Sequence, residues 1–521
     1  MPAWVAVEDF DRCYRAVQSR DQRFDGWFFT AVTSTGVYCR PSCPALTPKR
    51  QNVCFFPTAA AAQRAGFRAC LRCRPDAAPG SPEWLGRADV ASRALKLVLD
   101  GVVDRHGVSG LAARLGYSAR QLHRVLVAEV GTGALALARA QRAQTARVLI
   151  ESSDLSMAQV TFASGFASVR QFNDTVRAVF GRTPSQLRQA ARRRAGGGDD
   201  DVPGVPAVTV RLAYRRPFDT GGLFGFLGAR AVPGLEDGDD HSHTRSLRLA
   251  HGDGAVRLEA GDGYLEARFC MTDLRDLTSA IARCRHLANL DADPQAVDRA
   301  LAEDPVLRPL LDARPGVRVP GSVDGFETAV RAVVGQQVSV AGARRLGARL
   351  VEACGGDPVP GHPELRAFPS PDVLGALLEG HDDSLGLPAS RRRALLGLCR
   401  AVSSGDLVID AGVTPDELDG ALQDLPGIGP WTAQYVVLRA LGHPDAFVAT
   451  DLGACRGAKR LGLPDRPGAL EERAERWRPW RAYAQMHLWS VSAAGDGART
   501  TGAAARTRAR EGRTARKESA A

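Results

Sequence analysis

The sequence predicts a multidomain protein that combines two all-α units with two α+β units, and three observations carry this prediction. The chain has 521 residues, which is more than one hydrophobic core usually holds. Two low-complexity breaks interrupt it, PDAAPGSP at 75–82 and RRRAGGGDDDVPGVP at 192–206. The hydrophobic period also changes, from helical between the breaks to alternating after the second and back to helical from about 295. We therefore expect folded units over 1–78, 84–192, 206–292 and 295–492, and a disordered basic tail over 493–521.

Bulk composition narrows the class of protein without naming a function. The formal net charge is +10 and the pI is about 9.3, which favours a polyanionic partner, although an arginine-rich proteome explains the same numbers. No apolar run reaches membrane-spanning length, and the start, MPAWVAVEDFDR, is acidic and mixed rather than a secretory signal. We expect a cytoplasmic protein, where clustered cysteines are typical of metal binding or catalysis rather than of disulfides.

The first unit contains two close pairs of cysteines. Cys39 and Cys43 are followed 27 residues later by Cys70 and Cys73. Two such pairs can supply four thiolates to one tetrahedral Zn²⁺, so the spacing predicts a zinc site and leaves open whether it is purely structural. Cys13 and Cys54 fit no pair and are interpreted as packing residues.

The residues around these cysteines add a resemblance. The stretch over about 8–76, with CRPSC and GFRACLRCRPD, resembles the N-terminal domain of the Ada adaptive-response DNA repair protein. The resemblance implies that Cys39, a zinc ligand with Cys43, Cys70 and Cys73, accepts a methyl group from a DNA methyl phosphotriester. A four-thiolate zinc centre carries a formal charge of about −2 and repels phosphates, and methylation reduces that charge, so repair would tighten DNA binding. Phosphate contacts are expected from Arg40, Arg72 and Arg74.

The second unit contains an internal repeat. LAARLGYSARQLHRVLVAEVG (111–131) and VTFASGFASVRQFNDTVRAVFG (160–181) each predict a short helix, a glycine turn, a serine N-cap and a second amphipathic helix. This pattern indicates two helix-turn-helix motifs; the alternative is a plain helical bundle with a solvated polar face. The second helices would offer polar side chains to bases and phosphates, namely Arg120, Gln121, His123 and Arg124 in one copy and Arg170, Gln171 and Asn173 in the other.

The repeat resembles the AraC-type DNA-binding domain, which also follows the zinc domain in Ada. The first copy departs from the family, because TGALAL stands where a Thr-Pro helix start is expected. The order of domains implies a transcription activator that is switched on by methylation of Cys39, with promoter DNA and RNA polymerase as partners.

The third unit alternates short β-like runs, AVTVRLAY, SLRLA, AVRLEA and YLEARF, with the helical stretch DLTSAIARCRHLANL. The fourth unit is nearly all helical and contains LPGIGPWTAQY at 425–435, a predicted hairpin between two helices. Gly427 and Gly429 would let the backbone approach a DNA phosphate closely. A Gly-x-Gly turn alone is weak evidence, but Asp451 follows about twenty residues later.

Together these two units resemble the helix-hairpin-helix DNA glycosylases of the 3-methyladenine glycosylase II (AlkA) type. Supporting stretches include FLGARAVPGLE, GFETAVRAVVGQQVSV and ERAERWRPWRAYAQMHLW. The resemblance implies that Asp451 is catalytic. Trp431 stands where lyase-active relatives carry a lysine, so no Schiff base is expected, and no cysteine follows Cys455 to form an iron–sulfur loop.

The same resemblance implies a base pocket. Methylation of a ring nitrogen makes a purine cationic and already a good leaving group, so the site needs aromatic faces more than a general acid. The expected pocket consists of Gln336, Trp431, Tyr435 and Trp480. Gln337 falls where the family places a leucine wedge, and a polar wedge would fill the gap left by a flipped base with less apolar contact.

The expected fold class is therefore a small α+β zinc domain, an all-α double helix-turn-helix unit, an α+β domain and an all-α helix-hairpin-helix glycosylase domain. No Pro-Cys-His-Arg motif is present, so no alkylguanine transfer is assigned. We predict a monomeric, nucleoid-associated bacterial protein that repairs methyl phosphotriesters and excises alkylated purines such as 3-methyladenine by monofunctional hydrolysis in double-stranded DNA. The alternative is a transcription regulator with a non-catalytic glycosylase-like module.

Overall fold

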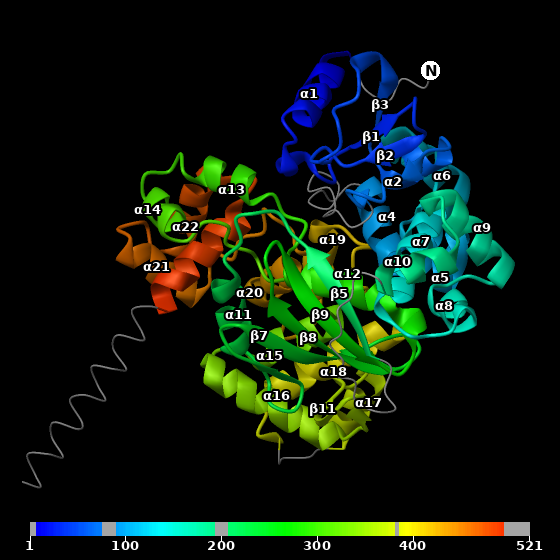
Figure 1. The fold of residues 1–521 in the computed structure, drawn as a ribbon. Coiled ribbons are helices and arrows are strands. Elements are labelled where there is room, and N and C mark those ends of the chain that lie inside the picture. Colours follow the sequence, from blue (N-terminus) through cyan, green and yellow to red (C-terminus); the bar gives the residue numbers. More distant parts are fainter. Residues whose placement is uncertain (1–6, 76–89, 193–206, 381–384, 494–521) are drawn as a thin grey trace, which may run out of the picture.

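The computed structural model describes residues 7–75, 90–192, 207–380 and 385–493 (Figure 1). The two predicted linkers lie almost entirely outside these ranges, and so does the predicted basic tail. The described helices include none with the length and apolar character that a membrane crossing requires. The observed architecture has the predicted class, with an N-terminal unit, a helix-turn-helix unit, a sheet unit and a C-terminal helical unit in chain order.

The N-terminal unit is a four-stranded sheet flanked by two helices. Its elements are α1 (Val7–Gln18), β1 (Phe29–Val32), β2 (Val37–Cys39), β3 (Val53–Phe56), α2 (Ala59–Arg64) and β4 (Arg68–Ala69). The strand order is β3-β1-β2-β4, and only β2 and β4 run parallel. This parallel pair sets the position of the cysteines, because Cys39 ends β2, Cys70 directly follows β4, and the Cys70 amide donates to the carbonyl of Tyr38 at 3.0 Å.

The described part of the helix-turn-helix unit consists of seven helices, with α7 as the longest. These are α4 (Val90–Leu99), α5 (Val102–Arg114), α6 (Ala119–Val130), α7 (Ala134–Ser152), α8 (Met157–Ala163), α9 (Val169–Phe180) and α10 (Pro184–Arg192). The predicted caps are present, since the hydroxyls of Ser118 and Ser168 accept from the amides of Gln121 and Gln171. The predicted turn at Gly165 has φ +80°, a conformation that favours glycine.

The two copies differ where the sequence departs from its family. In the second copy, Thr183 and Gln186 form reciprocal capping bonds before Pro184 starts α10. In the first copy, α7 begins after Gly133 with no side-chain cap. The missing cap is the structural consequence of TGALAL at this joint.

The sheet unit has five antiparallel strands in the order β5-β9-β8-β7-β6. They are β5 (Ala207–Ala213), β6 (Glu236–Gly238), β7 (Ser242–Arg248), β8 (Asp253–Ala260) and β9 (Tyr264–Met271), with helices α11 (Thr220–Gly228) and α12 (Leu277–Leu287). Three strands lie where alternation predicted them, and β7 overlaps its predicted run, SLRLA at 246–250, only over residues 246–248. The fifth, β6, was not predicted, because its sequence EDG carries no apolar alternation.

The C-terminal unit is helical except for one small hairpin. Its helices are α13 (Pro294–Leu301), α14 (Arg308–Ala313), α15 (Gly325–Val334), α16 (Val340–Cys354), α17 (Pro371–Glu379), α18 (Ala389–Ser404), α19 (Pro415–Gln423), α20 (Pro430–Val436), the π-helix η6 (Val437–Leu441), α21 (Leu452–Arg460) and α22 (Pro467–Ala474), and residues 481–493 are also helical. The unpredicted hairpin pairs β10 (Pro358–Val359) with β11 (His362–Arg366). Prolines at 358 and 363 hid these strands from sequence reasoning.

The helix-turn-helix unit packs against both units that follow it in the chain (Figure 1). The hydroxyls of Thr145 on α7 and Thr278 on α12 are hydrogen-bonded at 2.6 Å in a buried position. On the C-terminal unit, the Arg93 guanidinium donates to the carbonyl of Gly412 at 2.9 Å. The helix-turn-helix unit is thus in direct contact with the sheet unit and with the C-terminal unit.

Candidate functional sites

The four predicted cysteine ligands converge on one point. The sulfur atoms of Cys39, Cys43, Cys70 and Cys73 all lie within 4.8 Å of one another. Four sulfurs around a tetrahedral zinc at about 2.3 Å are separated by roughly 3.8 Å, so this donor set fits the metal by type and by spacing. The described residues contain one such group, which can hold one zinc ion.

The four sulfurs are not equivalent. Cys39 is only 9% exposed and Cys73 is 3% exposed, whereas Cys43 and Cys70 are half-buried. Hydrogen bonds shared among the four thiols lower the pKa of Cys70 and raise the pKa of Cys39. A metal ion bound by the four sulfurs would stabilise the thiolate form of each.

The loop between Cys39 and Cys43 is held by Asp25. The Asp25 carboxylate accepts from the Ser42 amide at 3.0 Å and from the Ser42 hydroxyl at 2.6 Å, and Arg40 pairs with it at 3.3 Å. The predicted phosphate contacts therefore differ in availability. Arg40 is paired within the loop, Arg74 pairs with Glu151 on α7, and Arg72 is exposed.

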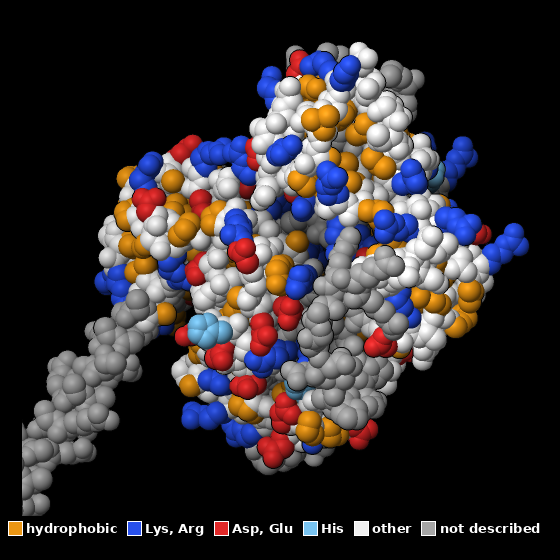
Figure 2. Space-filling model, viewed as in Figure 1, with side chains coloured by type: hydrophobic (Ala, Val, Ile, Leu, Met, Phe, Trp, Pro, Cys, Tyr) orange, Lys and Arg blue, Asp and Glu red, His pale blue; other side chains and the backbone are white. Residues whose placement is uncertain are grey.

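The predicted recognition side chains lie on the exposed faces of α6 and α9, and Figure 2 shows Lys and Arg side chains projecting from this unit. All seven are exposed, while Leu122 and Phe172 on the opposite faces are fully buried. Gln121 also has a structural task, because its side-chain oxygen accepts from the backbone amide of Ser118 at 3.1 Å. Arg170 lies near Asp174 at 4.0 Å with both side chains open to solvent.

Asp451 lies in a cavity of about 1030 Å³ in the C-terminal half. It is the N-cap of α21, and its Oδ1 accepts from the Ala454 amide at 2.8 Å. Two indole N–H groups hold the same carboxylate: Trp489 donates to Oδ1 at 2.7 Å and Trp431 donates to Oδ2 at 3.0 Å. Three donors thus fix the position of the carboxylate.

Aromatic rings line the cavity beside this carboxylate. Trp431 and Tyr435 are stacked with centroids 5.5 Å apart, and Phe226 from α11 stacks on Trp489 at 6.1 Å. Sequence reasoning placed Trp480 here, and the structure does not bring it to the cavity. Trp480 instead packs edge-on against Tyr483 at 5.9 Å and is half-buried. Trp489 takes the position that was assigned to Trp480.

Two arginines support the aromatic wall. Arg439 donates to the Tyr435 hydroxyl at 2.8 Å and to the Gly321 carbonyl at 3.1 Å. The Arg230 guanidinium lies over the Phe226 ring, 3.7 Å from its centroid. Burial acts to raise the pKa of Tyr435, but the nearby arginines outweigh burial and lower it.

Gln336 and Gln337 both line the cavity, but their roles differ. The Gln336 amide donates to the Gly427 carbonyl at 3.0 Å and to the Thr432 hydroxyl at 2.9 Å, so it ties α15 to the hairpin. Gln337 is exposed and has φ +54°, which is rare for a residue other than glycine.

In the hairpin, Gly427 has φ +86° and an added Cβ would meet the Cβ of Ala394 at 2.9 Å, so a glycine is required. Gly429 has φ −98° and open space around it, and it starts α20 as the N-cap. The two glycines therefore differ. Gly427 is required by the backbone conformation and by its close neighbour, whereas Gly429 leaves open space at the N-terminus of α20.

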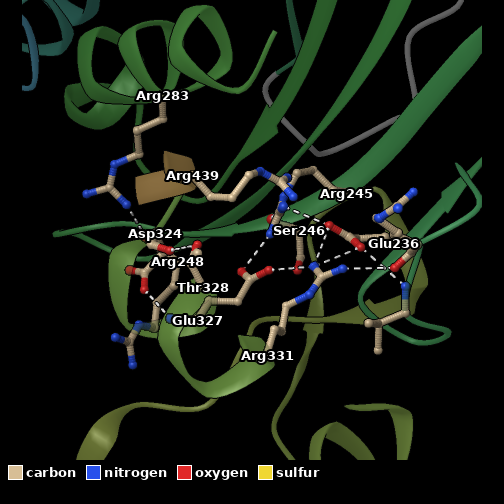
Figure 3. A network of polar contacts seen from close by, with 12 residues as sticks. Glu236, Arg245, Ser246, Arg248, Arg283, Asp324, Glu327, Thr328, Arg331 and Arg439 are labelled. Atoms are coloured by element: carbon tan, nitrogen blue, oxygen red, sulfur yellow. Dashed lines mark hydrogen bonds and ion pairs between the residues drawn. The ribbon is translucent and has the colours of Figure 1, made fainter. Parts of the chain in front are cut away.

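A buried network of charges lines one part of the cavity (Figure 3). Glu236 and Glu327 each bond to both Arg245 and Arg331, at 2.7 to 3.0 Å. Burial acts to raise the pKa of Glu236, but Arg331 and Arg245 outweigh it and lower that pKa to about 2. Arg331 also donates to the Arg230 carbonyl at 2.8 Å. The network thus fixes α15 and the Arg230 segment relative to the sheet, which positions the cavity walls.

Four family models match successive parts of the chain. They are described as "Metal binding domain of Ada" (residues 12–76), "Helix-turn-helix domain" (111–190), "AlkA N-terminal domain" (209–324) and "HhH-GPD superfamily base excision DNA repair protein" (330–482). In that order, the matched ranges contain the cysteine cluster, both helix-turn-helix copies, most of the sheet, and Asp451.

Relatives match the whole chain and its two halves. The "Probable bifunctional transcriptional activator/DNA repair enzyme AlkA" of Mycobacterium tuberculosis strain H37Rv is 52% identical over 486 residues, covering 93% of this chain and 97% of that protein. The "DNA-3-methyladenine glycosylase 2" of Escherichia coli K12 is 35% identical over 53% of this chain and 95% of its own. The "Bifunctional transcriptional activator/DNA repair enzyme Ada" of the same strain is 33% identical over 34% of this chain and 49% of its own.

Proposed function

The chain belongs to the family of bifunctional transcriptional activator and DNA repair enzymes that join an Ada-type metal-binding domain to an AlkA-type glycosylase. On that premise we propose that it excises alkylated purines such as 3-methyladenine from double-stranded DNA and, at a separate site, transfers methyl groups from DNA phosphotriesters to Cys39. The second reaction switches on its activity as a transcription activator.

The observation that carries the glycosylase proposal is the Asp451 carboxylate, held by two indole N–H groups at the edge of an aromatic cavity. An alkylated purine carries positive charge, so its glycosidic bond breaks readily and leaves an oxocarbenium-like sugar. A fixed carboxylate stabilises that developing cation and orients the attacking water. The rings of Trp431, Tyr435, Trp489 and Phe226 hold the extruded base by stacking.

The reaction ends at an abasic site. Lyase chemistry requires an amine that forms a Schiff base with the sugar, and no lysine is among the described residues that line the cavity. The proposed reaction is therefore hydrolysis, in which water replaces the base and the DNA backbone stays intact. Gln337 enters the gap left by the base and contributes polar rather than apolar contact there.

The methyl transfer proposal is supported by the cysteine cluster. The Cys39 sulfur forms a bond to the methyl carbon of the phosphotriester, and the carbon–oxygen bond breaks with its electron pair on oxygen, which leaves an ordinary phosphodiester. A zinc ion bound by the four cysteines would keep Cys39 as the thiolate at neutral pH. Because a thioether is formed and not reversed, each molecule acts once.

Methylation then acts through charge. Loss of one thiolate lowers the repulsion between the centre and DNA phosphates, and the exposed residues of α6 and α9 read a promoter. We propose RNA polymerase as the further partner of this activated form. A single zinc with no iron–sulfur cluster, a monomeric state and a place on the bacterial nucleoid belong to the same proposal.

Base release from methylated DNA by the purified protein is the direct test of the glycosylase. Free methylated base and alkali-sensitive abasic sites are expected from the wild type, and neither from Asp451→Asn. If the variant releases base at the wild-type rate, Asp451 is not catalytic; if neither protein releases base, the C-terminal half is a binding module.

A further inference from the structure

Asp25 makes one set of contacts within its own domain and one contact with another domain. Its side chain holds the loop between Cys39 and Cys43 through Ser42. Its backbone carbonyl accepts a hydrogen bond from the guanidinium of Arg215, which belongs to the sheet unit directly after β5. One residue thus joins the proposed methyl-acceptor loop to the glycosylase half, 190 residues further along the chain.

The arginine at this contact is fixed within its own half. A second Arg215 nitrogen donates to the Asp291 carbonyl at 2.9 Å, and Arg318 donates to the Arg215 carbonyl at 2.6 Å. Arg215 is 5% exposed, Asp25 is 4% exposed and Arg318 is 2% exposed. The contact is therefore a buried, rigid one rather than a surface pairing between two long side chains.

Because this hydrogen bond is buried, its loss would destabilise the segment around Asp25. A desolvated guanidinium must find acceptors for its N–H groups, and the Asp25 carbonyl is one of the two acceptors named above. Conversely, the buried Asp25 carbonyl loses a hydrogen-bond donor when Arg215 is removed. Loss of the arginine would thus loosen the peptide at Asp25, whose carboxylate is what holds Ser42 three residues from the acceptor cysteine.

We propose that Arg215, acting through Asp25, is a positioning residue for the methyl-acceptor loop, so that the glycosylase half holds the reactive site of the zinc domain in place. This inference rests on the proposed methyl transfer to Cys39. It names the structural link by which the two halves of the fusion depend on each other. Because coupling between two sites is reciprocal, the state of the zinc loop must also affect the segment around Arg215.

The test compares two adjacent arginines in the full-length, zinc-loaded protein. Arg215→Met removes the buried contact, while Arg216→Met removes an exposed arginine that pairs only with Asp262 among the described carboxylates. Amide hydrogen exchange over residues 37–44 and the rate of Cys39 methylation by an oligonucleotide with one methyl phosphotriester are measured in both. In Arg215→Met we expect exchange to rise and methylation to slow by roughly tenfold, the scale of one lost buried hydrogen bond, with base release unchanged. Arg216→Met should behave like the wild type.

Equal exchange and equal methylation rates in the two variants would overturn the proposal. A fall in base release that matches the fall in methylation would also overturn it, because Arg215 would then be merely structural. Arg215→Lys keeps the charge but bonds one carbonyl at a time, so an intermediate exchange rate is expected. If the wild type takes up no methyl group at Cys39, the proposed function fails, whereas the exchange rates still decide whether Arg215 holds the loop.

Discussion

The two proposed reactive side chains, Cys39 and Asp451, lie in opposite kinds of environment. Cys39 lies among three other sulfurs, and a metal ion bound by all four would stabilise its thiolate form. Asp451 is surrounded by neutral N–H donors from Trp431, Trp489 and a helix start, all from the C-terminal unit. The first site needs a metal and, through Asp25, a second domain. The second site is assembled by its own half alone.

This difference follows from the chemistry that each site performs. A nucleophile that is consumed in one turnover needs high reactivity once, and a metal centre supplies it at the cost of dependence on that metal. A carboxylate that acts in every turnover must return unchanged, which favours fixed donors that need no reorganisation. The comparison makes separate predictions for the two sites.

Removal of zinc should have the largest effect and should act on one site only. A chelator is expected to abolish methyl transfer and to unfold the cysteine loops, because the ligands have no other cross-link, while base release continues. Since the thiols must lose protons to bind metal, zinc retention should fall as the pH is lowered. Zinc content and both activities, measured across pH, check this. Loss of base release in parallel would contradict the separation of the sites.

Asp451→Asn is expected to reduce base release by roughly 10²–10³-fold, because the transition state loses its fixed negative charge. Asp465→Asn, at an exposed carboxylate that pairs with Lys459 at 3.3 Å, is the matched control and should retain full activity. Single-turnover rates on methylated DNA measure the effect. Equal rates for the two variants would remove Asp451 from the chemistry.

Trp489→Phe separates the two roles of this side chain, because phenylalanine keeps an aromatic face and loses the N–H group that holds Asp451. We expect a fall in the rate of base release by about tenfold, the scale of one hydrogen bond to a charged group, with little change in KM. Trp480→Phe should leave the rate unchanged. If Trp480→Phe lowered the rate of base release and Trp489→Phe did not, Trp480 rather than Trp489 would belong to the base pocket.

The sequence predicted Trp480 at the cavity, but the structure places Trp489 there, and this error shows what the sequence could not predict. Both residues lie in the same quoted stretch, ERAERWRPWRAYAQMHLW, and either could face Asp451 until the helix over 481–493 fixes its rotation. Element types and caps were predictable because they depend on local spacing, as at Ser118 and Ser168. The short strand β6 and the Arg215–Asp25 contact were not, because tertiary pairing alone creates them.

Arg170→Ala should have the smallest effect. This side chain is exposed on α9 and makes only a long pairing with Asp174 among the described residues, so its loss should not alter the fold. We expect DNA affinity to weaken several-fold and the salt dependence of binding to fall by about one phosphate contact. Binding titrations at several salt concentrations measure this. If the salt dependence of DNA binding were unchanged, Arg170 would be a solvent-exposed residue that makes no contact with DNA.

The central claim is that one chain carries two separate reaction sites, each with its own reactive side chain, and the mass of Asp451→Asn after incubation with methylated DNA tests it most directly. The variant should release no base and yet gain one methyl group, which peptide mapping locates on Cys39. A variant that gains no methyl group, or gains it on another cysteine, would contradict the account.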